Sequence, residues 1–541
     1  MSLFRLLGNY HVLDLTPATD RSPLPTAPSL GEKYTYVGRS VGFLILFSVL
    51  SLSCITLSTF QLYKDNAWLF PFFLLLAYTV VYFLISLRIN FLTKDFDLWA
   101  HQDMVWNWQP RRYPTVDVFL PNCGEPVAVL RNTWDGVAAM ARAYRGRVTV
   151  HCLDDAHRPA VRAMAADYGF VYHARPDRGW FKKAGNLRYG YRHSSSDFIA
   201  IFDADFRPRH DFLNELLPYL DRDPRLGIVQ SPQYFAFDAR QNWLERGAGA
   251  VQELFYRAIQ VSRQAHGGAI CVGSNAIYRR AALDDIGGTT LIEHSEDVHT
   301  GFDLRRKGWG LQYVPLVLAK GLCPSELNAF FKQQYRWCAG SMSLLSSAKF
   351  WRTRLPVMTR LCYFSGFMYY IHTAIYALFT PVIPLVMLLS LPDEIRLANY
   401  LLIFPSIVYM HLILPLWHRK PMGIEAASTR IVFGWAHLLA IWDKFTDHLQ
   451  EWQPTGAAHG KDKNYRLFRA GVFAFNFVPA AVWVVAAAWY MATRSAADFA
   501  PIFFLGLYYF FSVLKVAAYR EALPDSAPDA RALYLSEAMR C

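Results

Sequence analysis

Long apolar runs divide the chain into three parts. Two runs, residues 41–62 and 68–92, come first, and only residues 63–67 separate them. Four more runs follow later in the chain, at residues 361–391, 397–417, 467–491 and 499–518. The first of these four contains Pro381 and Pro384. A helix needs about 20 apolar residues to cross a membrane. The pattern therefore predicts about six transmembrane helices, beginning with a hairpin, and a kink at the two prolines.

The segment between the two groups of runs, residues 114–350, has the polar composition of a soluble domain. Strand-like β-branched runs alternate in it with segments of helical spacing; the strands are expected at residues 116–120, 148–153 and 198–202, and the helices at 127–144 and 159–168. This alternation predicts an α/β fold with a mainly parallel sheet, whose ligands bind at the carboxyl ends of the strands.

Two further stretches, residues 343–355 and 431–449, alternate apolar and polar positions at helical spacing. They are predicted to be amphipathic helices in the membrane interface, and ordinary surface helices are the alternative. The expected organisation is a cytosolic segment (1–40), a transmembrane hairpin (41–92), a cytosolic α/β domain ending in an interfacial helix (93–350), a transmembrane region (351–518) containing a cytosolic loop (418–466), and a cytosolic tail (519–541).

The distribution of charge predicts how the chain is oriented in the membrane. The 541 residues are 53% hydrophobic and 18% charged, with a formal net charge of +12. A basic chain could bind nucleic acid, but the basic residues here flank the apolar runs, which favours a membrane protein without nucleic acid. The loop after the run at residues 397–417 is rich in basic residues: Arg419, Lys420, Arg430, Lys444, Lys461, Lys463 and Arg466. The positive-inside rule therefore predicts that the α/β domain and both termini are cytoplasmic.

The cysteines and the first residues agree with this compartment. The eight cysteines include no C-x-x-C pair, which argues against a zinc ribbon or a redox motif and fits a reduced, cytosolic domain. Residues 1–31 are polar and are not expected to be a cleavable signal peptide.

Two carboxylate motifs follow predicted strands. Asp154 and Asp155 suit hydrogen bonds to a base and ribose, although acidic pairs in loops are common and usually solvated. Asp203 and Asp205 form a D-x-D motif after a buried strand. Carboxylate oxygens are the ligands preferred by Mg²⁺ or Mn²⁺, and such an ion neutralises a departing diphosphate.

A third acidic cluster surrounds Asp297, in the sequence Glu293–His299. A carboxylate here can act as the general base that deprotonates an attacking hydroxyl. The alternative is a solvated helix start, with Ser295 as the cap and Glu296 and Asp297 in the first turn.

The fourth motif contains Gln333, Arg336 and Trp337, which share one face of a helix. Arginine binds phosphate with a planar fork, and tryptophan offers a flat surface on which a sugar ring can stack. An amphipathic helix with Trp337 at the membrane interface is the alternative.

In this order and spacing, the motifs resemble those of the cellulose synthase superfamily of processive family 2 glycosyltransferases. The resemblance rests on Asp154-Asp155, Lys183-Ala184-Gly185-Asn186, Asp203-Ala204-Asp205, Ser295-Glu296-Asp297 and Gln333-x-x-Arg336-Trp337. The segment Pro121–Pro126 is similar to the nucleotide-binding first loop of that family, and Gly273-Ser274-Asn275 to its acceptor side.

The resemblance implies a GT-A fold and a role for each position. Asp297 is expected as the catalytic base, and Asp203 and Asp205 as ligands of Mg²⁺ (or Mn²⁺). UDP-sugar is expected to bind Pro121, Glu125, Asp154, Asp155, Lys183, Asp203 and Arg336. The acceptor and channel entrance are expected at Gly273, Ser274, Glu296, Gln333 and Trp337. A gating loop is expected at Trp452, Thr455 and Gly456, although the sequence there differs from the gating-loop motif of bacterial cellulose synthases.

Three departures from the family pattern shape the expected product. Ser295 replaces a common Thr, Phe206 replaces a common His, and only about 23 residues follow the last run, so no PilZ domain or cyclic-di-GMP site is expected. The resemblance thus implies an inverting β-glucan synthase of the inner membrane that uses UDP-glucose. It slightly favours a β-1,3 (curdlan-type) over a β-1,4 (cellulose-type) linkage. Its partners are the growing chain, membrane lipid and accessory proteins for export.

Two alternatives remain. A chitin- or hyaluronan-type synthase would use UDP-N-acetylglucosamine and need a pocket for the acetamido group. A membrane scaffold or transporter without turnover would not need all the candidate carboxylates, which are all present here.

Overall fold

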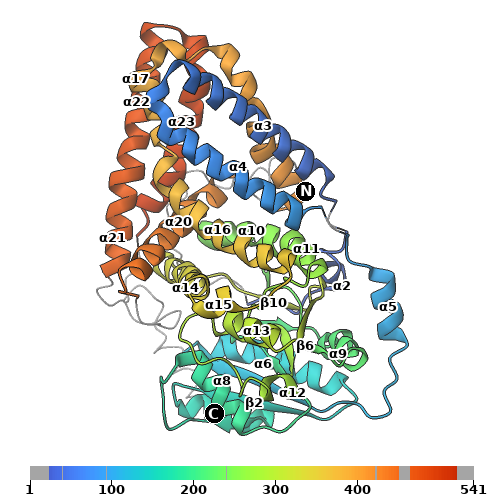
Figure 1. Ribbon diagram of the computed structural model, residues 1–541. Coiled ribbons are helices and arrows are strands. Elements are labelled where there is room, and N and C mark those ends of the chain that lie inside the picture. Colours follow the sequence, from blue (N-terminus) through green and yellow to red (C-terminus); the bar gives the residue numbers. More distant parts are fainter. Residues whose placement is uncertain are drawn as a thin grey trace.

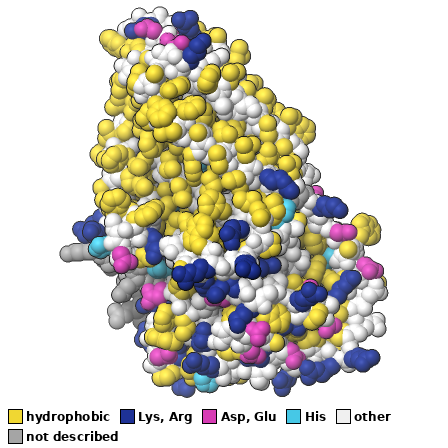
Figure 2. All heavy atoms as spheres, viewed as in Figure 1, with side chains coloured by type: hydrophobic (Ala, Val, Ile, Leu, Met, Phe, Trp, Pro, Cys, Tyr) yellow, Lys and Arg dark blue, Asp and Glu magenta, His cyan; other side chains and the backbone are white. Residues whose placement is uncertain are grey.

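The apolar runs and the α/β domain occupy opposite ends of the molecule (Figure 1). The computed structural model describes residues 24–520, except 39, 93, 239, 421–422 and 450–462. Apolar side chains cover the helical end, and Lys and Arg side chains form a band where that surface meets the α/β domain (Figure 2). This distribution matches a membrane-embedded part beside a domain in water.

Five helices of the described chain are long and apolar enough to cross a membrane, namely Gly42–Asp65, Ala67–Asn90, Val357–Ser390, Lys463–Thr493 and Ala496–Ala517. They contain α3 (Gly42–Asp65), α4 (Phe70–Asn90), α16 (Val357–Phe379), α17 (Val382–Ser390), α21 (Lys463–Val472), α22 (Val478–Thr493) and α23 (Ala496–Ala517). The third helix is interrupted at Thr380 and Pro381, between α16 and α17, as the prolines predict.

The run at residues 397–417 is not among these five. Here the chain forms short consecutive pieces: a 3-10 helix (Leu397–Leu402), α18 (Phe404–Val408), a π-helix (Tyr409–Ile413) and α19 (Leu414–His418). Pro405 and Pro415 lack an N–H for an uninterrupted helix, which accounts for the segmentation. The pieces pack against α3 and α23, so this stretch lies among the membrane helices.

The two expected amphipathic helices differ from their predictions. Residues 343–355 are not one helix: the first of them end α14 (Leu327–Leu345), and a short α15 (Ala348–Arg352) follows. Residues 431–449 fall largely in α20 (Ile424–Phe445), which is buried on most sides and packs against α10, α14, α16 and α23. This helix joins the two parts of the molecule, so its polar positions pair inside the protein.

The α/β domain is built on a seven-stranded sheet of order β3-β2-β1-β4-β8-β6-β9. Its strands are β1 (Val116–Asn122), β2 (Val148–Asp154), β3 (Val171–His173), β4 (Phe198–Ile201), β6 (Leu226–Gln230), β8 (Ala276–Arg279) and β9 (Gly310–Tyr313). Strand β8 pairs antiparallel with β4 and β6, and the other pairs are parallel. The predicted α/β domain with a mainly parallel sheet between apolar helices is confirmed.

Helices cover the sheet, and a small sheet extends it. The helices of this part are α5 (Leu98–Trp106), α6 (Val127–Ala143), α7 (Pro159–Tyr168), α8 (Lys182–Arg192), α9 (Phe212–Arg222), α10 (Trp243–Leu254), α11 (Gln260–Ala265), α12 (Arg280–Asp284) and α13 (Glu296–Arg306), and α2 (Leu30–Lys33) precedes the membrane hairpin. The second sheet has the order β5-β10-β7, from β5 (Arg207–Pro208), β7 (Tyr234–Phe235) and β10 (Ala319–Gly321).

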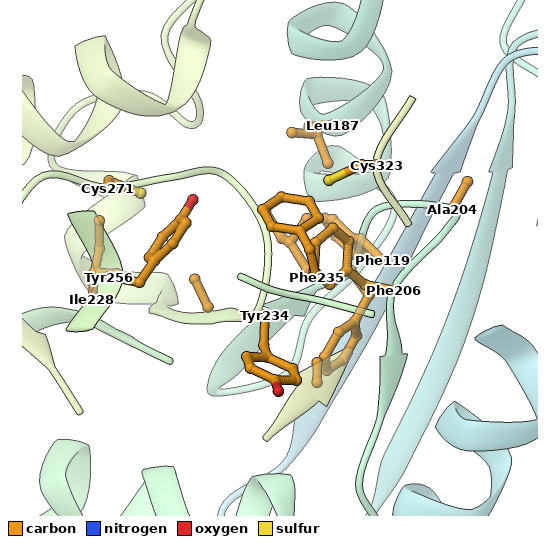
Figure 3. Packing of buried hydrophobic residues seen from close by; sticks show 14 of the residues in the cluster. Phe119, Leu187, Ala204, Phe206, Ile228, Tyr234, Phe235, Tyr256, Cys271 and Cys323 are labelled. Atoms are coloured by element: carbon orange, nitrogen blue, oxygen red, sulfur yellow. The ribbon is translucent and has the colours of Figure 1, made fainter. Parts of the chain in front are cut away.

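Aromatic packing supports the sheet edge that carries the motifs. Phe206 lies directly after the D-x-D motif and packs edge-on against Phe235, with ring centroids 5.7 Å apart (Figure 3). A Cβ at Gly321 would lie 2.7 Å from the Phe206 ring, so only glycine lets the ring approach this closely. Phe206, where the resembled family often has His, is thus a core residue here.

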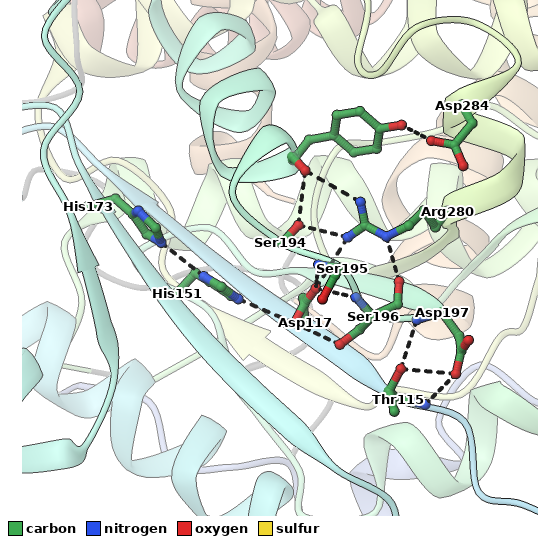
Figure 4. Close-up of polar contacts among 11 residues, drawn as sticks. Thr115, Asp117, His151, His173, Ser194, Ser195, Ser196, Asp197, Arg280 and Asp284 are labelled. Carbon is green, nitrogen blue, oxygen red and sulfur yellow. Dashed lines mark hydrogen bonds and ion pairs between the residues drawn. The ribbon is translucent and has the colours of Figure 1, made fainter.

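The opposite end of the sheet is held by a buried polar network (Figure 4). Asp117 accepts hydrogen bonds from the backbone N–H of Ser196 at 2.8 Å and from Arg280 at 3.2 Å, and His151 lies 3.3 Å away. Burial opposes ionisation of Asp117, but these donors outweigh it and lower its pKa to about 2. His173 extends the network from His151 at 3.0 Å. Because its members satisfy one another, this cluster stabilises the sheet.

A buried ion pair fastens the α/β domain to the membrane part. Arg246 of α10 donates to Glu425 of α20 from Nε at 2.9 Å and from Nη2 at 2.5 Å. The two side chains are only 4% and 2% exposed. Close by, Lys420 pairs with Glu253. Breaking a buried pair leaves an uncompensated charge, so these contacts define how the two parts dock.

Replacing Glu425 with Gln should therefore destabilise the protein strongly. The variant leaves Arg246 buried without its carboxylate, which typically costs about 3–5 kcal/mol. Thermal unfolding in detergent should show a clearly lower midpoint. The matched control is Asp393→Asn, which breaks a pair with Arg494 whose side chains are 87% and 42% exposed and should change little. Equal midpoints for Glu425→Gln and wild type would contradict the docking role.

Candidate active site

The predicted site residues converge on one cavity of about 620 Å³. It is lined by Pro121, Glu125, Asp155, Lys183, Asp203, Asp205, Glu296, Asp297, Gln333, Arg336 and Trp337. On the opposite side, the cavity is lined by Tyr82 of α4, Tyr369 of α16 and Phe433 of α20. The cavity therefore continues from the carboxyl edge of the sheet to the membrane helices.

The loop after β1 is held rigidly at the cavity. Glu125 accepts a hydrogen bond from the backbone N–H of Cys123 at 2.6 Å, and its carbonyl accepts one from Arg158 at 2.5 Å. Burial raises the pKa of the Glu125 carboxyl group. Pro121 and Glu125 both line the cavity, and their contact with the nucleotide stays a prediction.

The acidic pair after β2 is divided between two environments. Asp154 is fully buried and accepts hydrogen bonds from Ala156, Arg158 and Tyr172, so it shapes the loop, and it is not among the residues that line the cavity. Asp155 does line the cavity, where Arg175 holds its two oxygens at 2.5 and 2.8 Å. Donor binding by either aspartate stays a prediction.

Arg175 was not singled out by the sequence, because an isolated Arg in a loop carries no motif. Besides Asp155, its fully buried guanidinium donates to the carbonyls of Trp180 at 2.6 Å and Lys182 at 3.1 Å. A Cβ at Gly185 would lie 2.0 Å from the Trp180 oxygen, so glycine is required beside this turn. Arg175 thereby positions the start of α8, which carries Lys183.

Lys183 is the cation at the centre of the site. Its Nζ lies 2.5 Å from Asp203, 3.5 Å from Glu296 and 3.2 Å from the carbonyl oxygen of Gly273. Burial alone would lower the pKa of Lys183, but the carboxylates of Asp203 and Glu296 outweigh it and raise the pKa. The side chain therefore stays charged and links three separate motifs.

The D-x-D turn follows β4 and is fastened from behind. Ser274 accepts a hydrogen bond from the Asp203 N–H at 2.9 Å, and Thr133 donates to the Ala204 carbonyl at 2.8 Å. Ser274 is fully buried, so in this structure it supports the turn and does not line the cavity. Burial and the neighbouring Asp203 raise the pKa of Asp205 to about 7.

Asp297 lies in the first turn of α13, which begins at Glu296 as the helix-start alternative predicts. The predicted cap is wrong, because Ser295 has a φ of 54° and its side chain makes no cap hydrogen bond. A Cβ at Gly273 would lie 2.9 Å from the Asp297 Cβ, so glycine allows the two segments to approach. Burial and the Glu296 carboxylate raise the pKa of Asp297 to about 7.

Helix α14 presents the fourth motif to the cavity. Gln333, Arg336 and Trp337 all line it, as their helical spacing predicts. Burial lowers the pKa of Arg336 to about 10, with Glu296 and Asp203 acting in the opposite direction. Trp337 faces the site rather than a membrane surface, so it is not the interface anchor of the alternative interpretation.

The cavity has the charge and donor set expected of a divalent cation site. Glu125, Asp203, Asp205, Glu296 and Asp297 bring carboxyl groups to it, and burial together with the charge of Asp203 raises the pKa of Asp205. Within the described ranges, no cluster of three or more His, Cys, Asp or Glu side chains forms a complete metal site. Asp203 and Asp205 fit Mg²⁺ or Mn²⁺ whose remaining ligands come from phosphate and water.

The gating loop expected at Trp452, Thr455 and Gly456 lies outside the described residues.

Comparisons with known proteins show what this chain is similar to. Residues 198–417 match the family described as Glycosyl transferase family group 2. "Cellulose synthase 1" of Komagataeibacter xylinus is 35% identical over 262 residues, covering 48% of this chain and 17% of the relative. "Cellulose synthase catalytic subunit [UDP-forming]" of Xanthomonas axonopodis pv. citri is 32% identical over 266 residues, covering 48% of this chain and 36% of the relative.

The chain thus spans about a third or less of the length of these curated relatives. Among solved structures, the mannosyltransferase PcManGT from Pyrobaculum calidifontis, in complex with GDP-Man and Mn²⁺, is 16% identical with a TM-score of 0.45, covering 68% of this chain and 98% of that chain.

The match of family group 2 and the identity to cellulose synthases lead to one conclusion. The protein carries a family 2 glycosyltransferase domain related to those of cellulose synthases.

Proposed function

We propose that this protein is a processive, inverting β-glucan synthase that transfers glucose from UDP-glucose to a growing chain and moves the polymer across the inner membrane. The observation that carries the proposal is the single cavity, which holds all four motifs and continues to α4, α16 and α20. The UDP-forming name of a relative supports the donor. The basic loop 418–466 supports a cytoplasmic catalytic domain.

In the proposed reaction, an acceptor hydroxyl displaces UDP from the anomeric carbon of the donor sugar, and each side chain has one role. The acceptor hydroxyl oxygen attacks the anomeric carbon, its proton passes to the Asp297 carboxylate, and the bond from that carbon to UDP breaks with inversion. A pKa near 7 suits a base that works at neutral pH. Lys183 and Arg336, which line the cavity, would bind the diphosphate, and Asp203 and Asp205 would hold a divalent ion. That ion supplies positive charge for the leaving group.

The linkage depends on which acceptor hydroxyl points at Asp297. The relatives named cellulose synthase support a β-1,4 product, and a β-1,3 product is the other candidate. Trp337, which lines the same cavity as Asp297, is suited to stack under the acceptor sugar.

Purified protein in nanodiscs should make a polymer from radiolabelled UDP-glucose when Mg²⁺ or Mn²⁺ is present. Separate digestion with a β-1,4-glucanase and a β-1,3-glucanase identifies the linkage from the enzyme that releases label. Chelation with EDTA should stop synthesis, because the diphosphate would then have to leave without the positive charge of the ion held by Asp203 and Asp205. Polymer from UDP-N-acetylglucosamine but not from UDP-glucose would overturn the proposed donor.

Replacing Asp297 with Asn should abolish transfer while UDP still binds, because the base acts on the acceptor. A general base typically contributes a factor of about 10²–10⁴, so glucose incorporation should fall at least about 100-fold. The matched control is Asp303→Asn on the same helix, whose carboxylate pairs with Lys349 and does not line the cavity. Wild-type incorporation by Asp297→Asn would remove Asp297 from the mechanism.

Replacing Trp337 with Ala should weaken acceptor binding more than donor binding. Loss of a stacking surface should raise the KM for a glucan oligosaccharide roughly two- to tenfold and shorten the product, with UDP affinity near wild type. Trp351→Ala is the control, since Trp351 is 52% exposed and donates to the Leu345 carbonyl. Equal product lengths for Trp337→Ala and wild type would show that the ring does not contact the acceptor.

A further inference from the structure

One helical face leads from the chemistry toward the membrane helices. Tyr256, Ile259 and Arg263, at spacings of three and four residues, all line the cavity. They span the π-helix Phe255–Ile259 and α11, and π-helical turns are frequent at functional sites. Burial and then the Asp297 carboxylate raise the pKa of Tyr256, which places this residue at the catalytic end. Seven residues of helix span roughly 10 Å, so Arg263 lies about that far from Tyr256 along this face.

Arg263 carries a buried guanidinium that forms no ion pair within the described residues. Arg263 is only 3% exposed, and its Nε has no hydrogen-bond partner within the described residues. Within the described chain, no carboxylate forms an ion pair with it, whereas Arg175 and Arg246 are held by Asp155 and Glu425. A buried guanidinium keeps its charge and is costly without partners.

The surroundings of Arg263 suit a sugar. Tyr82 of α4 and Tyr370 of α16 are among its neighbours, and both line the cavity. A Cβ at Gly366 would lie 3.6 Å from the guanidinium, so this glycine brings α16 close to one side of it. Aromatic rings can cover the apolar faces of a pyranose, and the planar fork offers five N–H donors to its oxygens.

We propose that Arg263 is a binding site for the growing glucan, where its guanidinium donates hydrogen bonds to the hydroxyl oxygens of a sugar unit that has moved beyond Asp297. This inference rests on the proposed function and adds a site to it. Each new sugar unit that reaches Arg263 supplies hydrogen-bond acceptors for its guanidinium. The site thereby holds the chain between successive transfers, which keeps synthesis processive.

The test compares Arg263→Leu and Arg263→Lys with wild type, as full-length protein in nanodiscs supplied with UDP-glucose. Arg263→Leu should bind UDP normally and still transfer glucose to a short oligosaccharide. Its product should be shorter, and the KM for long oligosaccharides should rise roughly tenfold or more, as expected for loss of hydrogen bonds from a charged group. Arg263→Lys, which keeps the charge but loses the fork, should be intermediate.

Stability separates this role from a structural one. Removing an unpartnered buried charge should leave the thermal unfolding midpoint unchanged or higher. The control Arg257→Leu changes a neighbouring buried arginine that donates to the Trp417 carbonyl and does not line the cavity. It should lower the midpoint but not shorten the product. Wild-type product length and oligosaccharide KM in Arg263→Leu, or a midpoint lowered as in the control, would overturn the inference. Absence of polymer from the wild type would instead refute the proposed function.

Discussion

The contact between α10 and α20 is the constraint on which the remaining architecture depends. Arg246 and Glu425 are both nearly inaccessible to water, so each must find the other for the two parts of the molecule to dock. Hydrophobic packing alone tolerates sliding between helices, whereas a buried two-point ion pair does not. The cavity crosses this same junction, from the carboxyl edge of the sheet to α16 and α20. Its continuity therefore depends on that docking.

Charge is distributed unevenly along the cavity. At the catalytic end, carboxyl groups outnumber Lys183 and Arg336, and burial together with mutual repulsion raises the pKa values of Asp205 and Asp297. Toward the membrane helices, Arg263 has no carboxylate partner in the described chain. In the rest of the fold, buried charges such as Asp117 and Arg175 are fully paired. Asp205, Asp297 and Arg263 all line the cavity, where a ligand could complete their interactions.

Helix α20 shows how tertiary contacts change the meaning of a pattern. Its alternation of apolar and polar residues predicts a helix in the membrane interface, but the structure buries it between the two parts of the protein. Trp435 of this helix donates to Asn476 at 2.7 Å inside the helical part. Amphipathic spacing reports that a helix has two unlike neighbours, and it does not report whether those neighbours are lipid and water or two protein surfaces.

The sequence by itself determined the α/β domain between membrane helices, the strand ends that carry Asp155 and Asp203, and the helical face of Gln333, Arg336 and Trp337. These features follow from local periodicity and strand direction, which act over a few residues. Only the tertiary structure decided that Asp154 is a buried loop support, that Ser295 does not cap its helix, and that Arg175 and Arg263 matter at all. Those outcomes depend on partners distant in the chain, because burial and pairing are properties of the assembled fold.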